Sequence, residues 1–287
     1  MIVVSNKYAR EHEKHKTRNV IFGIIFGASF VVGIPLTFVI GPFAAIIIVV
    51  GAMIGGIGLA TTGAAQAKNI TEFKKEILAP RMMDFFSDFE YKPTESFLTS
   101  TVRELRLFNT GDSIYTSELY QGRYRGCSFA MSNVKCTETS RDSDGDTHTR
   151  TVFLGRLIII GASVIDEGEV KIRPKGYLPF FYRKGKSLEY DHQVCRNFDI
   201  RGSELVELPR YFLDHVNNFG SMFYKHKFYY KVTHDRIYIG IDNIGQLYDV
   251  GDCKDTSIEN IDRIIKKDSV FFTNLISLIL DAKNKEL

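Results

Sequence analysis

Two uncharged apolar runs near the start of the chain constrain its fold more than any other feature. Val20–Ile40 holds 21 residues and Phe43–Thr62 holds 20, and neither run contains Asp, Glu, Lys, Arg or His. At a rise of about 1.5 Å per residue, each run makes a helix about 30 Å long, which matches the hydrocarbon thickness of a bilayer. Only Gly41-Pro42 separates them, and this pair permits a reversal followed by the first turn of a new helix. The sequence therefore predicts a two-span transmembrane hairpin.

Basic residues flank this hairpin on both sides and are absent from its turn: Lys7, Arg10, Lys14, Lys16, Arg18, Lys68, Lys74, Lys75 and Arg81. The positive-inside rule then predicts a protein of the cell membrane with both termini in the cytoplasm. A cleaved signal peptide is disfavoured because the first run is too long, and Ala65-Gln66-Ala67, which resembles a cleavage site, lies beyond the second run. A wedge that enters and leaves one leaflet is the weaker alternative.

The two runs are rich in small residues at helical spacing. Gly23-x-x-x-Gly27 and Gly51-x-x-x-Gly55 would let helix backbones approach closely, and Gly58 extends the second face. Two readings stay open: the hairpin packs on itself, which we favour, or it forms a homo-oligomer. The absence of ionisable residues from both runs argues against a pump or channel.

The predicted organisation is a cytoplasmic flank at residues 1–19, the hairpin at 20–67 and a cytoplasmic domain at 68–287. A net charge of +3 gives no global nucleic-acid signature, so we expect no nucleic-acid partner. Cys127, Cys136, Cys195 and Cys253 fit no zinc or CxxC spacing, and a reducing compartment leaves them as thiols.

Periodicity in residues 68–287 predicts an α+β domain with an antiparallel sheet and packed helices. The predicted helices cover 68–88 with a break near Pro80, 94–108, 208–224, and a last segment from Thr256. Its apolar stripe is broken at Asp268-Ser269, which predicts two packed helices or one kinked helix in place of a coiled coil. The predicted strands are 114–121, 124–138 with a β-bulge near Asn133, 151–160 buried on both faces, 169–174, and the hairpin 227–233 with 237–242. Residues 141–149 read as a polar loop.

Short motifs along the chain resemble those of the bacterial membrane proteins grouped as domain-of-unknown-function family 3137. They are Tyr91-Lys92-Pro93, Ser117-Glu118, Gly122–Phe129, Val152–Gly155, Phe198-Asp199-Ile200, Leu208–Phe212 and Ile237–Ile241. The resemblance implies a bacterial membrane protein whose biochemical role is not established, and it supplies no catalytic residues.

Motifs for chemistry are weak. Counting from Asp142, an EF-hand would need Gly at position six and Glu at position twelve, but Gly145 is fourth and Phe153 is twelfth, so a solvated hairpin tip is favoured over a calcium site. His192-x-x-Cys195 lacks a second ligand pair. No P-loop, GxSxG or GxGxxG stands between a strand and a helix. We therefore assign no catalytic residue, metal ligand or cofactor.

One loop has the composition of a membrane-contact site. Its candidate residues are the cations and aromatics Lys175, Tyr177, Phe180, Phe181, Tyr182, Arg183, Lys184 and Lys186. Aromatic rings reach the interface and cations attract anionic lipid headgroups, at about 1 kcal/mol for each cation. The alternative is a loop whose rings close the core while its cations stay in water. RNA binding is a weaker third reading because no RNP-like strand accompanies the loop.

These observations favour a membrane-anchored binding or scaffold protein, not an enzyme, that acts at the inner surface of the membrane on a protein, lipid or small ligand. The alternative is a membrane-bound enzyme whose site has no recognisable local motif.

Overall fold

The computed structural model describes residues 2–40, 43–176, 186–188, 194–202, 206–223, 225–244 and 258–283. The chain divides into two compact units, Met1–Pro80 with Asp249–Ile264 and Arg81–Tyr248 with Ile265–Leu287. The architecture is α+β, as predicted: two long apolar helices precede an antiparallel sheet with helices. Each unit is described by itself below.

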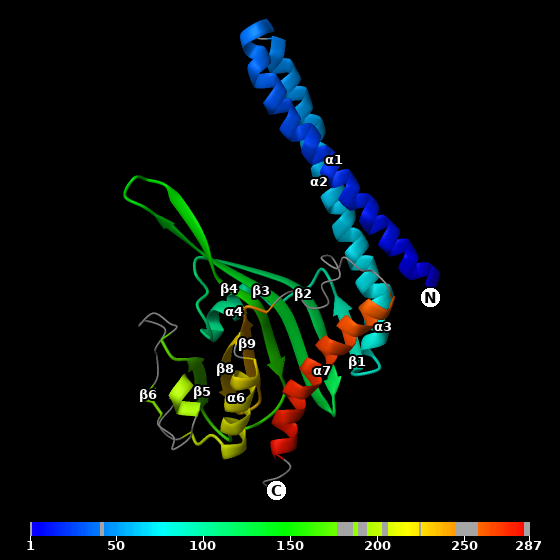
Figure 1. Ribbon diagram of the computed structural model, residues 1–287. Helices are drawn as coiled ribbons and strands as arrows, with labels where there is room; N and C mark the ends of the chain where they lie inside the picture. The colour runs from blue at the N-terminus through cyan, green and yellow to red at the C-terminus, as the bar shows by residue number, and fades with distance from the viewer. Residues whose placement is uncertain are drawn as a thin grey trace. The chain divides into compact units, whose positions relative to one another are not determined.

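The first unit is built on a helical hairpin of α1 (Ile2–Ile40) and α2 (Phe43–Phe73), drawn in blue and cyan in Figure 1. A π-helical segment, η1 (Lys74–Leu78), continues α2. Both helices run beyond the apolar runs, and the predicted flank is helical from Ile2. In this polar part, Asn19 Nδ2 donates a hydrogen bond to Gln66 Oε1 at 3.3 Å, which ties α1 to α2.

Among the described residues, two segments are long and apolar enough to cross a membrane. They are Glu13–Leu36, with a mean hydropathy of 2.1, and Ile48–Met82, with a mean hydropathy of 1.7. Length and composition therefore agree with two candidate spans.

The second unit is built on a nine-stranded sheet in the order β1-β2-β3-β4-β9-β8-β5-β7-β6, and every neighbouring pair is antiparallel. The strands are β1 (Ser87–Lys92), β2 (Ser113–Tyr124), β3 (Cys127–Arg141), β4 (Thr147–Ile160), β5 (Glu169–Pro174), β6 (Lys186–Ser187), β7 (Phe198–Gly202), β8 (Lys227–Thr233) and β9 (Ile237–Asp242). Its helices are α4 (Thr99–Leu105), α5 (Val194–Asn197) and α6 (Arg210–Met222). Two further helices, α3 (Ala79–Met82) and α7 (Ile258–Lys283), belong to this unit from Arg81 and from Ile265 onward.

Helices cover both faces of this sheet. On one face, Phe219 of α6 meets Phe228 of β8 at 5.4 Å between ring centroids, and Phe272 of α7 meets Phe129 of β3 at 6.3 Å. On the other face lies α4 with the segment that follows it, and here Phe108 stacks on Phe153 of β4 at 3.7 Å. The second core also contains Val102, Leu105, Leu107, Val134, Cys136, Leu157 and Tyr229, all buried. The predicted strand 151–160 is thus central and buried on both faces from Gly155 to Ile160, where only Ile159 is half-buried, whereas Thr151 and Leu154 are exposed.

The β-bulge expected near Asn133 lies in the neighbouring strand instead. β3 pairs with β4 in unbroken register from Phe129 to Cys136, whereas β2 carries one extra residue, Glu118, opposite Asn133 and Ser132. Along β3 the apolar residues change from odd positions (Cys127, Phe129, Met131) to even ones (Val134, Cys136), and this change has another cause. Phe129 faces α7, and Cys136 faces the α4 core, so different ends of the strand are buried on different faces.

Two other predictions differ from the structure, and a third is decided between its alternatives. α4 begins at Thr99, not Thr94, because Ser96 Oγ bonds Thr116 Oγ1 and the Phe97 N–H donates to Ser132 Oγ. Of the alternatives of one helix or two for the last helical segment, the structure has one helix, α7, which continues through Asp268-Ser269, where the buried Ser269 hydroxyl donates to Met82 Sδ at 3.3 Å. The predicted polar loop 141–149 is strand at both ends, and only residues 142–146 form the turn.

The hairpin β8–β9 and the strand β5 have the predicted bounds. The prediction missed β1, the two-residue β6, α5 and β7. Of these, β1 carries a legible signal, because Phe89 and Tyr91 are buried and alternate with polar residues.

Candidate functional site

The glycines predicted to pack the hairpin fall into two groups. A β-carbon added at Gly55 would lie 2.7 Å from Phe26 Cβ, and one at Gly51 would lie 2.5 Å from Ser29 Cβ. Gly58 is equally close to the ring of Phe22. The glycine face of α2 therefore packs on α1. Gly23 and Gly27 lie elsewhere, since a β-carbon on either would have no described atom within 4 Å.

The predicted membrane-contact loop falls largely outside the described residues. Lys175 is exposed in a turn after β5, and the backbone of Lys186 lies in β6, while Tyr177, Phe180, Phe181, Tyr182, Arg183 and Lys184 are not described. His192 and Cys253 are outside as well, and Cys195 lies in α5. Among the described residues, no group of three or more His, Cys, Asp or Glu side chains is placed to hold a metal ion.

Charged side chains cluster on β5 and β8. The carboxylate of Glu169 accepts from Lys171 Nζ and from Lys231 Nζ, both at 2.6 Å, and the two lysine side chains are each 13% exposed. Burial alone would raise the pKa of Glu169, but the hydrogen bonds from both lysines hold it below its ordinary value. Burial likewise lowers the pKa of Lys171. The carboxylate lies between an ammonium group of its own strand and one of β8, so this cluster stabilises the pairing of the two strands.

Arg173 of β5 connects the sheet to α4. Its Nε donates to the Leu107 carbonyl at 3.1 Å and its Nη2 donates to the Arg106 carbonyl. Carbonyls at a helix C-terminus have no partner within the helix and carry the negative end of the helix dipole. The buried guanidinium therefore positions α4 on the sheet, and burial lowers the pKa of Arg173.

A polar cluster that the sequence did not reveal surrounds the bulged residue Glu118. One carboxylate oxygen accepts from the Tyr91 hydroxyl at 2.7 Å, and the other accepts from the Tyr120 hydroxyl at 3.0 Å and from Asn133 Nδ2 at 2.9 Å. Burial and the Glu118 charge raise the pKa of both phenols. The phenols are therefore fixed as donors near neutral pH, and the cluster joins β1, β2 and β3.

A shallow depression of about 410 Å³ lies on the sheet face that carries α4. Arg123 and Arg236 line it, together with Gln121, Ser128 and Ile159. Both arginines have carboxylate partners, Asp88 at 3.8 Å and Asp235 at 3.2 Å respectively. The depression thus offers compensated charges and hydrogen-bonding groups to a polar ligand.

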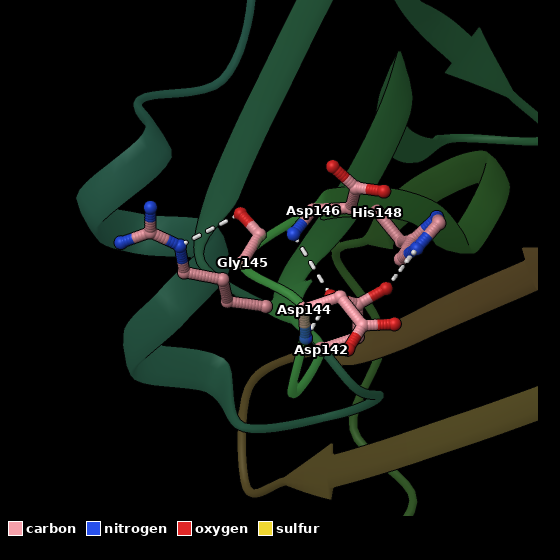
Figure 2. Close-up of polar contacts among 6 residues, drawn as sticks. Asp142, Asp144, Gly145, Asp146 and His148 are labelled. Atoms are coloured by element: carbon pink, nitrogen blue, oxygen red, sulfur yellow. Dashed lines mark hydrogen bonds and ion pairs between the residues drawn. The ribbon is translucent and has the colours of Figure 1, made fainter.

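The long hairpin of β3 and β4 ends in a tightly bonded turn (Figure 2). Asp142 Oδ1 accepts from the Asp144 N–H at 3.1 Å and the Asp146 N–H at 2.8 Å, and Oδ2 lies 3.0 Å from His148 Nε2. Gly145, at φ +92°, takes the left-handed position of the turn. The contact with His148, followed by the backbone amides, lowers the pKa of Asp142. The carboxylate thus orders the turn by bonding its own backbone.

Comparison of the chain with protein families, with curated proteins and with solved structures gives no match. The arrangement of its residues is therefore the basis for a functional proposal.

Proposed function

We propose that this chain is a membrane-anchored binding protein, held by the α1–α2 hairpin, whose sheet domain acts at the inner surface of the membrane. The observation that carries the proposal is the unburied apolar surface of the hairpin. Within Glu13–Leu36, only 11% of the apolar 18-residue stretch that qualifies as a span is buried. Within Ile48–Met82, the buried share of the corresponding stretch is 17%. Large side chains such as Ile24, Val31 and Ile57 are more than half exposed. Water would penalise that surface and lipid would accept it.

The orientation follows from charge. Arg10, Lys14, Lys16 and Arg18 precede the first span, Lys68 and Lys75 follow the second, and the connection Gly41-Pro42 is uncharged. This asymmetry supports cytoplasmic termini. The resemblance to family 3137 supports the same placement in a bacterial cell membrane. The binding partner is proposed to be a protein or an anionic lipid surface.

Alkaline extraction of membranes tests the anchor, because an integral hairpin stays in the pellet while a peripheral protein is released. A cysteine at Gly41 tests the orientation. It should react with an impermeant thiol reagent in intact spheroplasts while the four native cysteines do not. A reporter that is active only outside the cytoplasm, fused after Leu287, should stay inactive. Release by alkali, or an active reporter, contradicts the proposal.

Once the anchor and the orientation are established, crosslinking in intact cells identifies the binding partner.

A further inference from the structure

The β3–β4 hairpin extends beyond the rest of its sheet. β2 follows β3 only as far as the pair Ser113–Thr137, and β9 follows β4 only from the pair Asp242–Gly155. β3 and β4 continue to pair with each other up to Arg141 and Thr147. We call residues 138–151 the arm. Figure 1 shows it in green, projecting from the sheet as a two-stranded ribbon.

The arm has almost no support of its own. Within the described chain, every residue from Thr139 to Thr151 is exposed except the half-buried Gly145. An isolated two-stranded ribbon is marginally stable in water, and three or more strands are needed for independent stability. A projecting polar ribbon is therefore a structure that gains stability from an added strand.

The turn decides which backbone groups of the arm point outward. The Asp142 N–H donates to the Asp146 carbonyl at 3.0 Å, so these two residues bond each other across the hairpin. In an antiparallel ladder such pairs alternate with pairs whose N–H and C=O groups face away. By that alternation Thr147, Thr149 and Thr151 direct their N–H and C=O groups away from β3.

The two edges of the arm differ in how these outward groups are bonded. On β3, the Thr137 carbonyl accepts from the Asp112 N–H at 2.9 Å and the Thr139 N–H donates to Asp112 Oδ2 at 2.7 Å. On β4, the backbone groups of the three threonines have no partner in the part of the chain that the structure describes. The pairing of β9 with β4 ends at Asp242, opposite Gly155, and the Asn243 N–H that follows donates to the Leu154 carbonyl. Among the described residues, the β4 edge at Thr147–Thr151 is therefore open to a further strand.

We propose that the open edge of β4 pairs with the same edge of a second copy of this chain, antiparallel about a two-fold axis at Thr149. Thr149 then lies opposite Thr149 of the second copy, and Thr147 lies opposite its Thr151. The outward groups on both copies fall at the same three positions, so each N–H meets a carbonyl across the axis. The result is a four-stranded sheet in which the ladder is complete, and such a two-fold contact is self-closing.

The side chains of the arm suit this symmetric pairing on both faces. On one face Thr149 Oγ1 already lies 3.3 Å from Thr139 Oγ1, and the axis extends this contact into a row of threonines, which form favourable cross-strand pairs. On the other face His148 would lie opposite Arg150 of the second copy. Arg150 is paired with Glu138 at 2.8 Å and His148 with Asp142 at 3.0 Å, so no uncompensated like charges meet.

Cysteine crosslinking of the full chain in its membrane tests the axis directly. In the variant Thr149→Cys the two new thiols face each other at a Cα separation of about 5.5 Å, within the range of a disulfide. Thr139→Cys is the matched control, because three strand spacings, about 14 Å, separate its two copies. Mild oxidation should give a disulfide-linked dimer of the first variant only, above the background of the native cysteines. Equal crosslinking of both variants, or none of the first, overturns the proposal.

A proline variant tests the ladder itself. Thr149→Pro removes an outward N–H and leaves the bonds between β3 and β4 intact, so the fold should keep its melting temperature. Because the substitution is present in both copies, the dimer loses two hydrogen bonds of the ladder. The dissociation constant of the detergent-solubilised dimer should therefore rise about tenfold or more. If the variant keeps the oligomeric state of the native chain, the edge is solvated and the proposal is wrong. If the native chain is always monomeric and the variant has a lower melting temperature, the edge is covered within the chain and the proposal is wrong as well.

Discussion

The imidazole of His215 on α6 stands at 82° to the phenol ring of Tyr230 on β8, with 6.3 Å between the ring centroids. Both side chains are buried, and neither polar group has a hydrogen-bond partner among the described residues. Phe212 and Phe219 stack beside the imidazole. An apolar surrounding disfavours the charged ring, and burial lowers the pKa of His215 to about 4.

The first prediction is a loss of stability in mild acid. The unfolded chain binds a proton at His215 near pH 6.5 and the folded chain binds it only near pH 4, so the unfolded state takes up more protons between these values. Stability is full above pH 6.5 and falls as the pH drops toward 4, by up to about 3 kcal/mol. Circular dichroism melts of the solubilised chain across this range measure it.

His215→Phe is the matched variant, because it keeps an aromatic ring among aromatic neighbours and removes the titration. Its melting temperature should fall less than that of the native chain between pH 6.5 and 4. His226→Gln serves as the control and should leave the native slope in place, because His226 Nδ1 contacts the backbone carbonyl of Asn243 and not a carboxylate. Identical slopes for the native chain and His215→Phe would show that other groups govern acid stability.

The second prediction concerns Glu118, whose carboxylate accepts three side-chain hydrogen bonds at φ +56°. Glu118→Ala leaves the buried phenol of Tyr120 and that of Tyr91 without this acceptor, and should cost about 2–4 kcal/mol of unfolding free energy. Glu118→Gln retains an acceptor oxygen and should cost less. Glu118→Gly should be more stable than Glu118→Ala by about 1 kcal/mol, because glycine accepts the left-handed conformation. Denaturant unfolding measures all three, and an Ala variant as stable as the native chain contradicts the assignment.

Patterns of apolar residues account for the part of this fold that the sequence predicted. The strands Lys227–Thr233 and Ile237–Asp242 alternate cleanly, and the two apolar runs are long and unbroken. The arm escaped prediction because its strands are polar on both faces, so no alternation marks them. The Glu118 cluster escaped for another reason. Its members come from three strands, and a one-residue bulge sets which of them meet, so no local pattern records their contact.

The third prediction distinguishes the two glycine groups of the hairpin. Gly55→Ala places a methyl group 2.7 Å from Phe26 Cβ and 2.8 Å from the Phe26 backbone, so the helices must separate. Such overpacking costs about 1–3 kcal/mol. Gly27→Ala is the matched control, because nothing described lies within 4 Å of the added carbon. Hydrogen exchange of the full chain in lipid nanodiscs should accelerate in Ile48–Thr62 for the first variant only. If Gly27→Ala instead disperses an oligomer, the open glycine face of α1 joins copies of the chain.

The last prediction concerns the loop at residues 175–186, where aromatics and cations alternate in sequence. If this loop touches the bilayer, a quencher carried by lipid tails should quench an environment-sensitive dye on Phe181→Cys in nanodiscs. The quenching should increase with anionic lipid and decrease with added salt, because the contact depends on headgroup charge. The same dye on Ser143→Cys, at the exposed arm tip, controls for chance collisions with lipid. If the loop dye is not quenched, and changing Phe180 and Phe181 together to Ser lowers the melting temperature, the rings belong to the core and the cations alone face water.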